Sequence, residues 1–218
     1  MERRAKSEVL TLYTYWRSTT SYRVRIALAM KGIEYQSRPV DLLAGEQGAA
    51  EYVALNPVAG VPTLVLEDGT ALTQSMAILD YLDSLVRDPA LLPKRNAILR
   101  ARVLAAAMVF ASDVHPVNNL KVVNRVMDLS DKATGIAWMQ HWMQLGCAAF
   151  DALIDPDAPF AFGDQPTLAD ICLVAQLYNA HRWDVDLSAT PRLLDIEKRC
   201  LALPAFAAAR PENQMDAI

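Results

Sequence analysis

The spacing of apolar residues changes along the first part of the chain and predicts alternating strands and helices. Residues 9–15 are β-branched, aromatic and alternating, which is typical of a strand. The apolar positions that follow recur at helical spacing until Lys31-Gly32, which resembles a helix C-terminus. Residues 33–40 then predict a second strand, parallel to the first because a helix connects the two.

A hairpin and a helix complete this first region. Asp68-Gly69 lies between the apolar runs 60–66 and 71–73, a strong signal for two antiparallel strands. A helix is expected from Gln74-Ser75 onward, and residues 42–55 can hold a short one. The predicted order is β-α-β-α-β-β-α, a small mixed sheet with helices packed on it.

The composition changes at residues 87–93, where two prolines within seven positions suggest a domain boundary. Every later segment has the pattern of a helix. The predicted helices are 96–112, 118–129, 133–154, 167–178, 191–200 and a short one at 204–210. We therefore predict an α/β domain at 8–87 and an all-helical domain at 94–218, with residues 211–218 frayed at the end of the chain.

One helix of the second domain has a clear start signal. Thr167 followed by Asp170 matches a capping box, and apolar residues follow directly. We expect Asp170 to be structural and this helix to be central to its domain.

Composition and charge narrow the class of protein. The 218 residues are 53% hydrophobic, with a net charge of −4 and a pI of about 5.4, which argues against nucleic acid or an anionic membrane as the main partner. No apolar run approaches the roughly 20 residues that span a bilayer. Cys147, Cys172 and Cys200 are far apart and form no metal-binding pattern, so we expect no metal and a reducing, cytoplasmic location.

Candidate chemistry gathers in the stretch Trp16–Arg25, between the first strand and the first helix. Its serines and threonines suit a helix N-terminus, which also attracts anions. Arg17, Arg23 and Arg25 add positive charge. The stretch alone is compatible with a capped helix and solvated arginines or with an anion-binding site.

The residues Ser18 to Leu28 resemble the signature S-S-C-S-x-R-V-R-I-A-L of zeta-class glutathione transferases. Asn56-Pro57, residues 61–64 and Gln74-Ser75 are similar to the glutathione-binding part of that superfamily. Segments 113–122 and 179–187 are similar to helical segments of the class, so the resemblance spans residues 9–210.

The resemblance implies a thioredoxin-like N-terminal domain, an all-helical C-terminal domain, a homodimer and glutathione as cofactor. The implied activity is cis–trans isomerisation of maleylacetoacetate to fumarylacetoacetate in tyrosine breakdown, through reversible addition of the glutathione thiolate to the double bond. The substrate is then a small dicarboxylate.

The resemblance also assigns roles to single residues. Ser18 takes the position of the thiol-activating serine, and Thr19 and Thr20 replace a serine and a cysteine, so all three are candidate catalytic residues. Arg17 and Arg182 match positions that hold substrate carboxylates. The implied glutathione contacts are Ser18, Thr19, Thr20, Ser21, Tyr22, Arg23, Gln47, Val61, cis-Pro62, Gln74, Ser75, His115, Asn119, Leu120 and Lys121.

Three other functions stay open. The first is maleylpyruvate isomerisation, although bacterial enzymes of that kind carry paired arginines where this chain has Leu120-Lys121. The second is glutathione transfer to, or dehalogenation of, small α-halo acids. The third is a non-catalytic interaction module, which the presence of Ser18 and Gln74-Ser75 disfavours. The sequence favours maleylacetoacetate.

Overall fold

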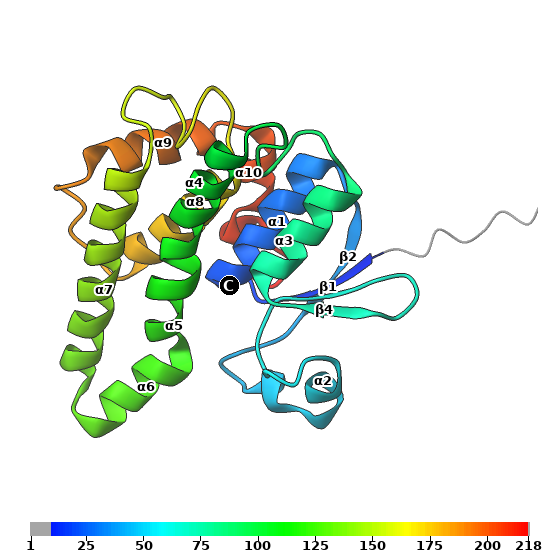
Figure 1. The fold of residues 1–218 in the computed structure, drawn as a ribbon. Helices are drawn as coiled ribbons and strands as arrows, with labels where there is room; N and C mark the ends of the chain where they lie inside the picture. Colours follow the sequence, from blue (N-terminus) through cyan, green and yellow to red (C-terminus); the bar gives the residue numbers. More distant parts are fainter. Residues whose placement is uncertain (1–9, 218) are drawn as a thin grey trace, which may run out of the picture. The chain divides into compact units, whose positions relative to one another are not determined.

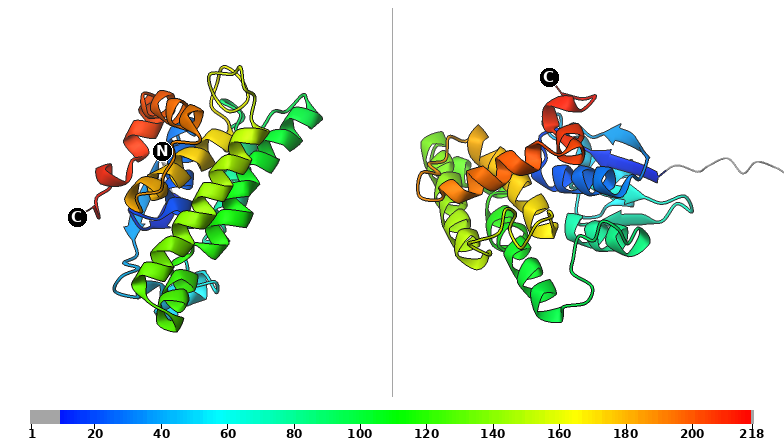
Figure 2. Two further views of the ribbon diagram at one scale, coloured as in Figure 1. Left: turned by 90° about the vertical axis from the view of Figure 1, so that its left-hand side faces the viewer. Right: turned by 90° about the horizontal axis from the view of Figure 1, so that it is seen from above.

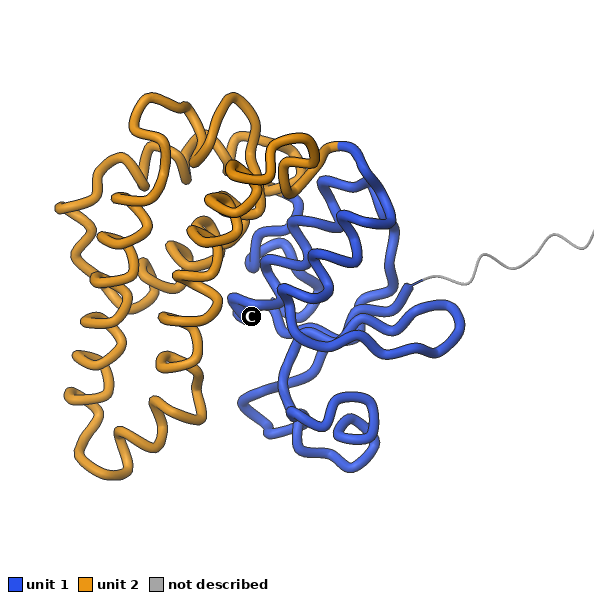
Figure 3. Tube along the Cα trace, in the orientation of Figure 1, with its two compact units in different colours: residues 1–88, 208–218 blue, residues 89–207 orange. Residues whose placement is uncertain are grey.

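A computed structural model describes residues 10–217 of the chain. The chain divides into two compact units, coloured separately in Figure 3. Unit 1 consists of residues up to 88 together with those from 208 onward, and unit 2 of residues 89–207. The last segment therefore groups with the α/β unit, whereas the sequence-based division assigned it to the helical domain.

Unit 1 is built on a four-stranded mixed sheet. Its strands are β1 (Leu10–Thr14), β2 (Tyr35–Pro39), β3 (Thr63–Val65) and β4 (Ala71–Thr73). They lie in the order β2-β1-β3-β4, with β1 parallel to β2 and the other pairs antiparallel. Leu12 and Leu64 are paired across β1 and β3 and are fully buried, so they form the centre of the core. The predicted parallel crossover and hairpin are both confirmed.

Helices cover both faces of this sheet. Helices α1 (Thr19–Lys31) and α3 (Ser75–Leu85) lie side by side on one face, and the short α2 (Ala50–Leu55) lies on the other (Figure 1). Helix α1 ends at Gly32, whose φ of 62° is left-handed as a C-terminal glycine allows. Its Arg23 and Arg25 are each only 1% exposed, so the interpretation of solvated arginines is wrong for both.

The C-terminal segment is ordered and returns to unit 1. After α10 (Pro204–Ala209), a 3-10 turn forms at Pro211–Asn213. The Gln214 side chain donates to the carbonyls of Ala208 (3.3 Å) and Arg210 (2.8 Å), which folds the segment on itself. Figures 1 and 2 show it in red beside α1. The prediction of frayed residues is wrong up to residue 217.

Unit 2 is helical. Its elements are α4 (Ala97–Met108), a π-helical turn η2 (Val109–Val114), α5 (His115–Val117), α6 (Leu120–Leu129), α7 (Lys132–Leu153), α8 (Leu168–Arg182), α9 (Pro191–Leu201) and the start of α10. Helix α8 is almost wholly buried, and its Thr167–Asp170 capping box is confirmed. The Asp170 carboxylate also accepts from the Ala161 N–H (2.8 Å), and burial raises the pKa of this carboxyl against the lowering effect of its hydrogen bonds.

The π-helical turn was not predicted from the sequence. It lies between α4 and α5 and packs against α7, where Gly146 leaves room for the Val114 side chain. Phe110 of the turn stacks on Phe150 of α7, with ring centroids 4.8 Å apart. A π turn adds one residue to a helical turn, which shifts the helical register of the residues after it, beginning with His115.

Among residues 10–217, none of the helices is long and apolar enough to cross a membrane. The same part of the chain has no group of three histidine, cysteine or acidic side chains arranged to hold a metal ion.

Candidate functional site

The N-terminus of α1 is organised by the Ser18 hydroxyl. Ser18 is the N-cap of the helix, and its Oγ accepts from the backbone N–H of Ser21 (3.2 Å). The same Oγ lies 3.0 Å from the Thr20 Oγ1, and Thr20 Oγ1 donates to the carbonyl oxygen of Val61 (2.8 Å). These bonds join four of the predicted site residues: Ser18, Thr20, Ser21 and Val61.

The donor in the Ser18–Thr20 hydrogen bond can be assigned by counting hydroxyl protons. A hydroxyl has one proton, and the carbonyl of Val61 can only accept, so the Thr20 proton is used there. Ser18 must therefore be the donor to Thr20, while it accepts from Ser21. The Ser18 proton is thus held at the end of a helix, where a positive backbone potential favours an incoming anion.

A second group of bonds fixes the loop that carries Val61. The Val61–Pro62 peptide bond is cis, as the family resemblance implied. Tyr52 Oη donates to the Gly60 carbonyl (2.6 Å), and Asn56 Nδ2 donates to the same oxygen (2.7 Å). Together with Thr20, these side chains hold the carbonyls of Gly60 and Val61, so the backbone of this loop is braced from two directions.

The start of α3 has an unusual backbone conformation. Gln74 has a φ of 68°, a conformation that residues with a side chain rarely adopt, and its side chain does not cap the helix. Strain of about 1–3 kcal/mol at such a residue is typical of ligand-binding positions. Ser75, the first residue of α3, is buried. A carboxylate is the kind of ligand that this helix start favours.

Gln47 provides an independent sign of a ligand. Its Oε1 is buried and has no hydrogen-bond partner among the described residues. A buried amide oxygen without a partner is unfavourable by about 1–3 kcal/mol, which a ligand N–H would relieve. The Gln47 Oε1 therefore suits a ligand N–H, and the helix start at Ser75 suits a ligand carboxylate. A peptide such as glutathione carries both groups.

Other residues predicted to contact glutathione are buried. Thr19 is 6% exposed, and Ser21, Tyr22 and Arg23 are at most 1% exposed. Ser21 uses its backbone N–H in the cap, and its Oγ is without a partner in the described part of the chain. The burial of Arg23 does not support a direct contact between its side chain and a ligand.

Arg17 is positioned by its neighbour. Its guanidinium carbon lies 4.1 Å from the centroid of the Trp16 ring, a cation–π contact, and the side chain remains partly exposed. Trp16 is 5% exposed and therefore a rigid support. Arg17 is thus held directly before Ser18.

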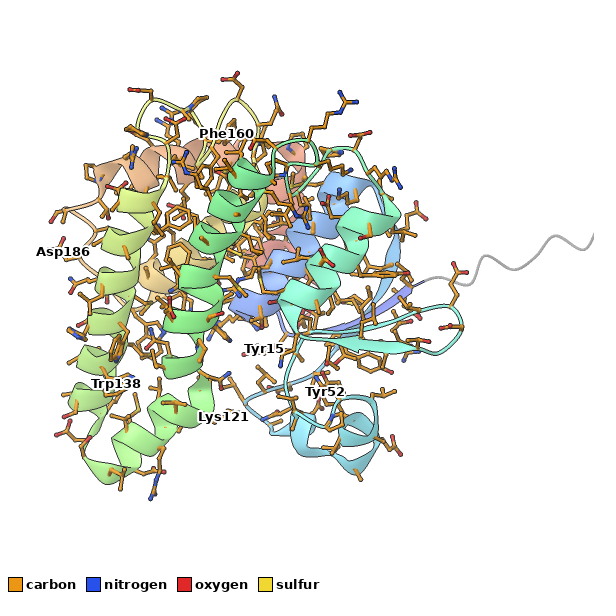
Figure 4. The ribbon with its side chains drawn as sticks, in the orientation of Figure 1. Tyr15, Tyr52, Lys121, Trp138, Phe160 and Asp186 are labelled. Carbon is orange, nitrogen blue, oxygen red and sulfur yellow. The ribbon has the colours of Figure 1, made fainter. Side chains whose placement is uncertain are left out.

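In unit 2, four predicted contacts follow one another around the start of α6. Asn119 caps α6 by accepting from the N–H of Lys121 (3.2 Å). Leu120 and Lys121 are exposed, and His115 is half-buried in α5; Lys121 is labelled on α6 in Figure 4. The segment therefore presents one apolar and one basic side chain to solvent.

Arg182, the other predicted substrate contact, is the last residue of α8 and is exposed. Its Nη1 lies 3.4 Å from Asn179 Oδ1, and its guanidinium is 5.8 Å from the Trp183 ring centroid. These contacts leave the Arg182 side chain exposed to solvent. Trp138 of α7 donates to the carbonyl of Val117 (2.9 Å), which ties α7 to the end of α5.

Sequence reasoning missed three residues that shape the site. Tyr52 braces the cis-proline loop, and Arg25 and Asp216 hold the loop between β1 and α1. The R-V-R motif did include Arg25, but nothing in the sequence separated a buried arginine from a solvated one. Neither Tyr52 nor Asp216 has a local signal, because each acts on residues distant in the sequence.

None of the cysteines is a candidate nucleophile. All three lie in the described part of the chain, are free and are buried. Burial raises the pKa of the Cys147 thiol to about 12 and raises the pKa of Cys200 as well. Any thiolate chemistry at this site must therefore come from a bound thiol.

Comparison with known proteins agrees with this geometry. The family described as "Glutathione S-transferase, N-terminal domain" matches residues 8–84. A maleylacetoacetate isomerase of Rhizobium meliloti (strain 1021) is 50% identical over 206 residues, covering 93% of this chain and 96% of the relative.

Two solved structures are also similar. A maleylpyruvate isomerase, a bacterial zeta-class glutathione transferase in its holo form, has a TM-score of 0.91 at 38% identity, covering 95% of this chain and 100% of its own. A maleylacetoacetate isomerase of Anaeromyxobacter dehalogenans 2CP-1, with dicarboxyethyl glutathione and citrate in its active site, has a TM-score of 0.87 at 42% identity, covering 96% and 98%.

Proposed function

This chain belongs to the zeta-class glutathione transferase and maleylacetoacetate isomerase family, and we propose that it is a glutathione-dependent isomerase that converts maleylacetoacetate to fumarylacetoacetate. The observation that carries the proposal is the Ser18 hydroxyl at the N-terminus of α1, whose proton is donated to Thr20 and can turn to a bound anion. When bound, glutathione supplies the thiolate that adds reversibly to the cis double bond.

Ser18 and the helix end favour the ionised thiol. A free thiol has a pKa near 8.5, and a helix N-terminus with a hydroxyl donor lowers it. The proton that Ser18 gives to Thr20 can rotate to a sulfur anion, which is a stronger acceptor than a neutral hydroxyl. Thr20 then keeps its own bond to Val61, so the loop stays in place while the proton moves.

Several groups are suited to bind the tripeptide. Gln47 and Ser75 are proposed to receive its glycyl and γ-glutamyl ends, and Val61 its cysteinyl backbone. The Val61 carbonyl already accepts from Thr20, but a carbonyl has two lone pairs and can accept a second bond. His115 and Asn119 remain proposed contacts from unit 2.

Arginines are proposed to hold the substrate. Arg17 and Arg182 carry planar guanidinium groups that bind carboxylates with two parallel hydrogen bonds. The relative crystallised with dicarboxyethyl glutathione binds a glutathione derivative with two added carboxyl groups, which supports a dicarboxylate for this chain too. Positive charge at Arg17 also stabilises the enolate that addition to a conjugated double bond creates.

Maleylpyruvate is the second candidate substrate because a maleylpyruvate isomerase is among the similar structures. At the start of α6 this chain has an exposed leucine and one lysine, Leu120 and Lys121. Because this chain has one basic residue where maleylpyruvate isomerases resemble each other in carrying a pair, we propose maleylacetoacetate as the preferred substrate. We propose α-halo acids as poorer substrates of the same thiol site.

The test is an absorbance assay of maleylacetoacetate, maleylpyruvate and a small α-halo acid, each with and without glutathione. We expect the fastest turnover with maleylacetoacetate and none without glutathione. Turnover in the absence of glutathione contradicts the mechanism. Inactivity on both maleyl substrates together with activity on the halo acid contradicts the isomerase assignment.

We further propose that the protein is a cytoplasmic homodimer. Three free, buried cysteines suit a reducing compartment, and the family resemblance implies a dimer. Light scattering on the purified protein measures the mass directly; a mass near 24.0 kDa contradicts the dimer, and a mass twice that value supports it.

A further inference from the structure

The loop between β1 and α1 has buried backbone groups that need partners. Tyr15 and Trp16 are 8% and 5% exposed, and their N–H and carbonyl groups lie outside the strand and helix ladders. Buried backbone groups are almost always hydrogen-bonded, because leaving one unpaired is costly. The loop is short, and Ser18 follows Trp16 by two positions, so whatever fixes Trp16 also places Ser18.

The partner of the Trp16 N–H is Asp216, 200 positions later in the chain. Asp216 Oδ2 accepts from this N–H at 3.0 Å. The segment that carries Asp216 is itself folded, with the Ala217 N–H donating to the Gln214 carbonyl (3.1 Å) and Gln214 donating to Arg210 (2.8 Å). The carboxylate is therefore held by an ordered turn of the main chain.

Arg25 completes the attachment from the other side. Its Nη2 donates to the Trp16 carbonyl (2.9 Å) and its Nη1 to the Tyr15 carbonyl (3.3 Å). Its Nε donates to the Ala209 carbonyl (3.2 Å), at the start of the C-terminal segment. One buried guanidinium thus joins the loop and the segment.

One oxygen of the Asp216 carboxylate lies in surroundings that lower the stability of the fold. Its Oδ1 is buried and lacks a hydrogen-bond partner within residues 10–217. A buried carboxylate oxygen without a partner lowers stability. Such a local conflict, next to residues that carry chemistry, is typical of a functional role.

We propose that Asp216 is a positioning residue for the thiol site. It fixes the Trp16 backbone, Trp16 supports the Arg17 guanidinium at 4.1 Å, and the next residue is Ser18. Through Trp16, the C-terminal segment sets the direction of both the proposed substrate arginine and the proposed thiolate donor. This inference rests on the proposed function.

The experiment compares Asp216→Ala and Asp216→Asn, with Glu212→Ala as the matched control. Glu212 is an acidic residue of the same segment, but its side chain is 56% exposed and makes only a long 4.0 Å contact with Arg210. Asparagine keeps an oxygen acceptor for the Trp16 N–H, whereas alanine does not. The readouts are kcat and KM with maleylacetoacetate, the pKa of the bound glutathione thiol from thiolate absorbance, thermal unfolding, and hydrogen exchange of the peptide containing Trp16.

We expect Asp216→Ala to lower kcat about tenfold, to raise the KM for the dicarboxylate, to raise the thiol pKa and to speed exchange at Trp16. Asp216→Asn should keep kcat, KM, the thiol pKa and the exchange rate close to their wild-type values. Glu212→Ala should leave all four unchanged. Unchanged exchange and thiol pKa in Asp216→Ala overturn the proposal. So does a loss that Asp216→Asn fails to restore, since the acceptor is then not what matters.

Failure of the proposed function can be distinguished from failure of the role proposed for Asp216. If the wild type does not isomerise either maleyl substrate, the exchange rate at Trp16 and the pKa of bound glutathione still decide the role of Asp216. If Asp216→Ala does not fold, Asp216→Leu, which also lacks an acceptor for the Trp16 N–H, replaces it and is compared with Asp216→Asn by the same two measurements.

Discussion

The two units of this protein hold their candidate site residues in different ways. In unit 1, side chains fix backbone atoms: Thr20 binds the Val61 carbonyl, Tyr52 the Gly60 carbonyl and Asp216 the Trp16 N–H. In unit 2, the candidate residues Lys121 and Arg182 are exposed side chains at helix ends. Unit 1 is braced by hydrogen bonds where it is expected to meet glutathione, whereas unit 2 presents long, exposed side chains.

This difference indicates a division of labour. A thiol must be placed within fractions of an ångström of its activating donor, so the groups around Ser18 are fixed by hydrogen bonds. A substrate carboxylate can be held by a long cationic side chain that adapts to it. Substitutions at the start of α1 should therefore change catalysis with little change in stability. Buried substitutions in unit 2 should lower stability with little direct change in catalysis.

The largest effect on chemistry is expected for Ser18→Ala. It removes the proposed donor to the thiolate and should lower kcat about 100-fold, with a much smaller change in glutathione binding. The pKa of bound glutathione should rise by about one unit, because a hydrogen bond to the ionised form is lost. Steady-state kinetics and thiolate absorbance measure both. Normal turnover in this variant would assign activation to Thr19, Thr20 or the helix N-terminus.

The largest effect on stability is expected for Asp170→Ala in unit 2. Its carboxylate accepts from the Ala161 N–H and from both the N–H and the hydroxyl of Thr167, and all these donors would lose their partner. We expect the free energy of unfolding to fall by about 3 kcal/mol. Denaturant unfolding measures this loss. Thr167→Ala is the milder control, with an expected loss of about 1 kcal/mol. A loss of activity without a loss of stability would contradict a structural role.

Gly146→Ala tests the packing of the π-helical turn. An added methyl group would overlap Val114, whose branched side chain has little freedom to move. We expect a loss of about 2 kcal/mol in the free energy of unfolding. Gly135→Ala is the matched comparison on the same helix, because it meets Met127, which is unbranched and can adapt. Equal losses in the two variants would show that side-chain stiffness is not the cause.

Thr20→Val tests the hydroxyl pair in unit 1. The variant keeps the shape of threonine but leaves the Val61 carbonyl without this donor and Ser18 without its acceptor. The loss of about 1 kcal/mol of hydrogen bonding predicts a fall of about fivefold in kcat. Thr20→Ser restores the hydroxyl and should restore the rate. A Thr20→Val enzyme with wild-type kinetics would assign no positioning role to Thr20.

The smallest effect is expected from His181 in unit 2. Its Nε2 is 2.8 Å from Glu197 Oε2, and this hydrogen bond raises the pKa of His181 above its usual value. The resulting stability is fully present below a pH of about 6.5 and is lost as the pH rises through the higher pKa of the folded state. Because the side chain is half exposed, we expect less than about 1 kcal/mol.

The test of this pH dependence compares the wild type with His181→Gln. The free energy of unfolding of each is measured at several pH values from about 5.5 to 8.5. The two proteins should converge at the alkaline end. If the difference in unfolding free energy between the two proteins grew with pH, its sign would be opposite to the one expected. The His181–Glu197 pair would then be excluded as its cause.

The sequence by itself determined the elements of this protein. The strand and helix order of unit 1, the hairpin at Asp68-Gly69 and the capping box at Thr167–Asp170 are all confirmed. Each depends on residues a few positions apart, whose periodicity and turn chemistry are visible in the chain. The hydroxyl cluster at Ser18 was found for the same reason, since a helix N-terminus is a local signal.

The tertiary structure alone decided how these elements are held. Arg25 was expected to be either solvated or part of a positive field, and it is a buried support for the loop before Ser18. The π-helical turn depends on space left by Gly146 in a different helix. Asp216 acts on a residue 200 positions away. No local pattern encodes such contacts, because burial and long-range partners exist only after the chain has folded.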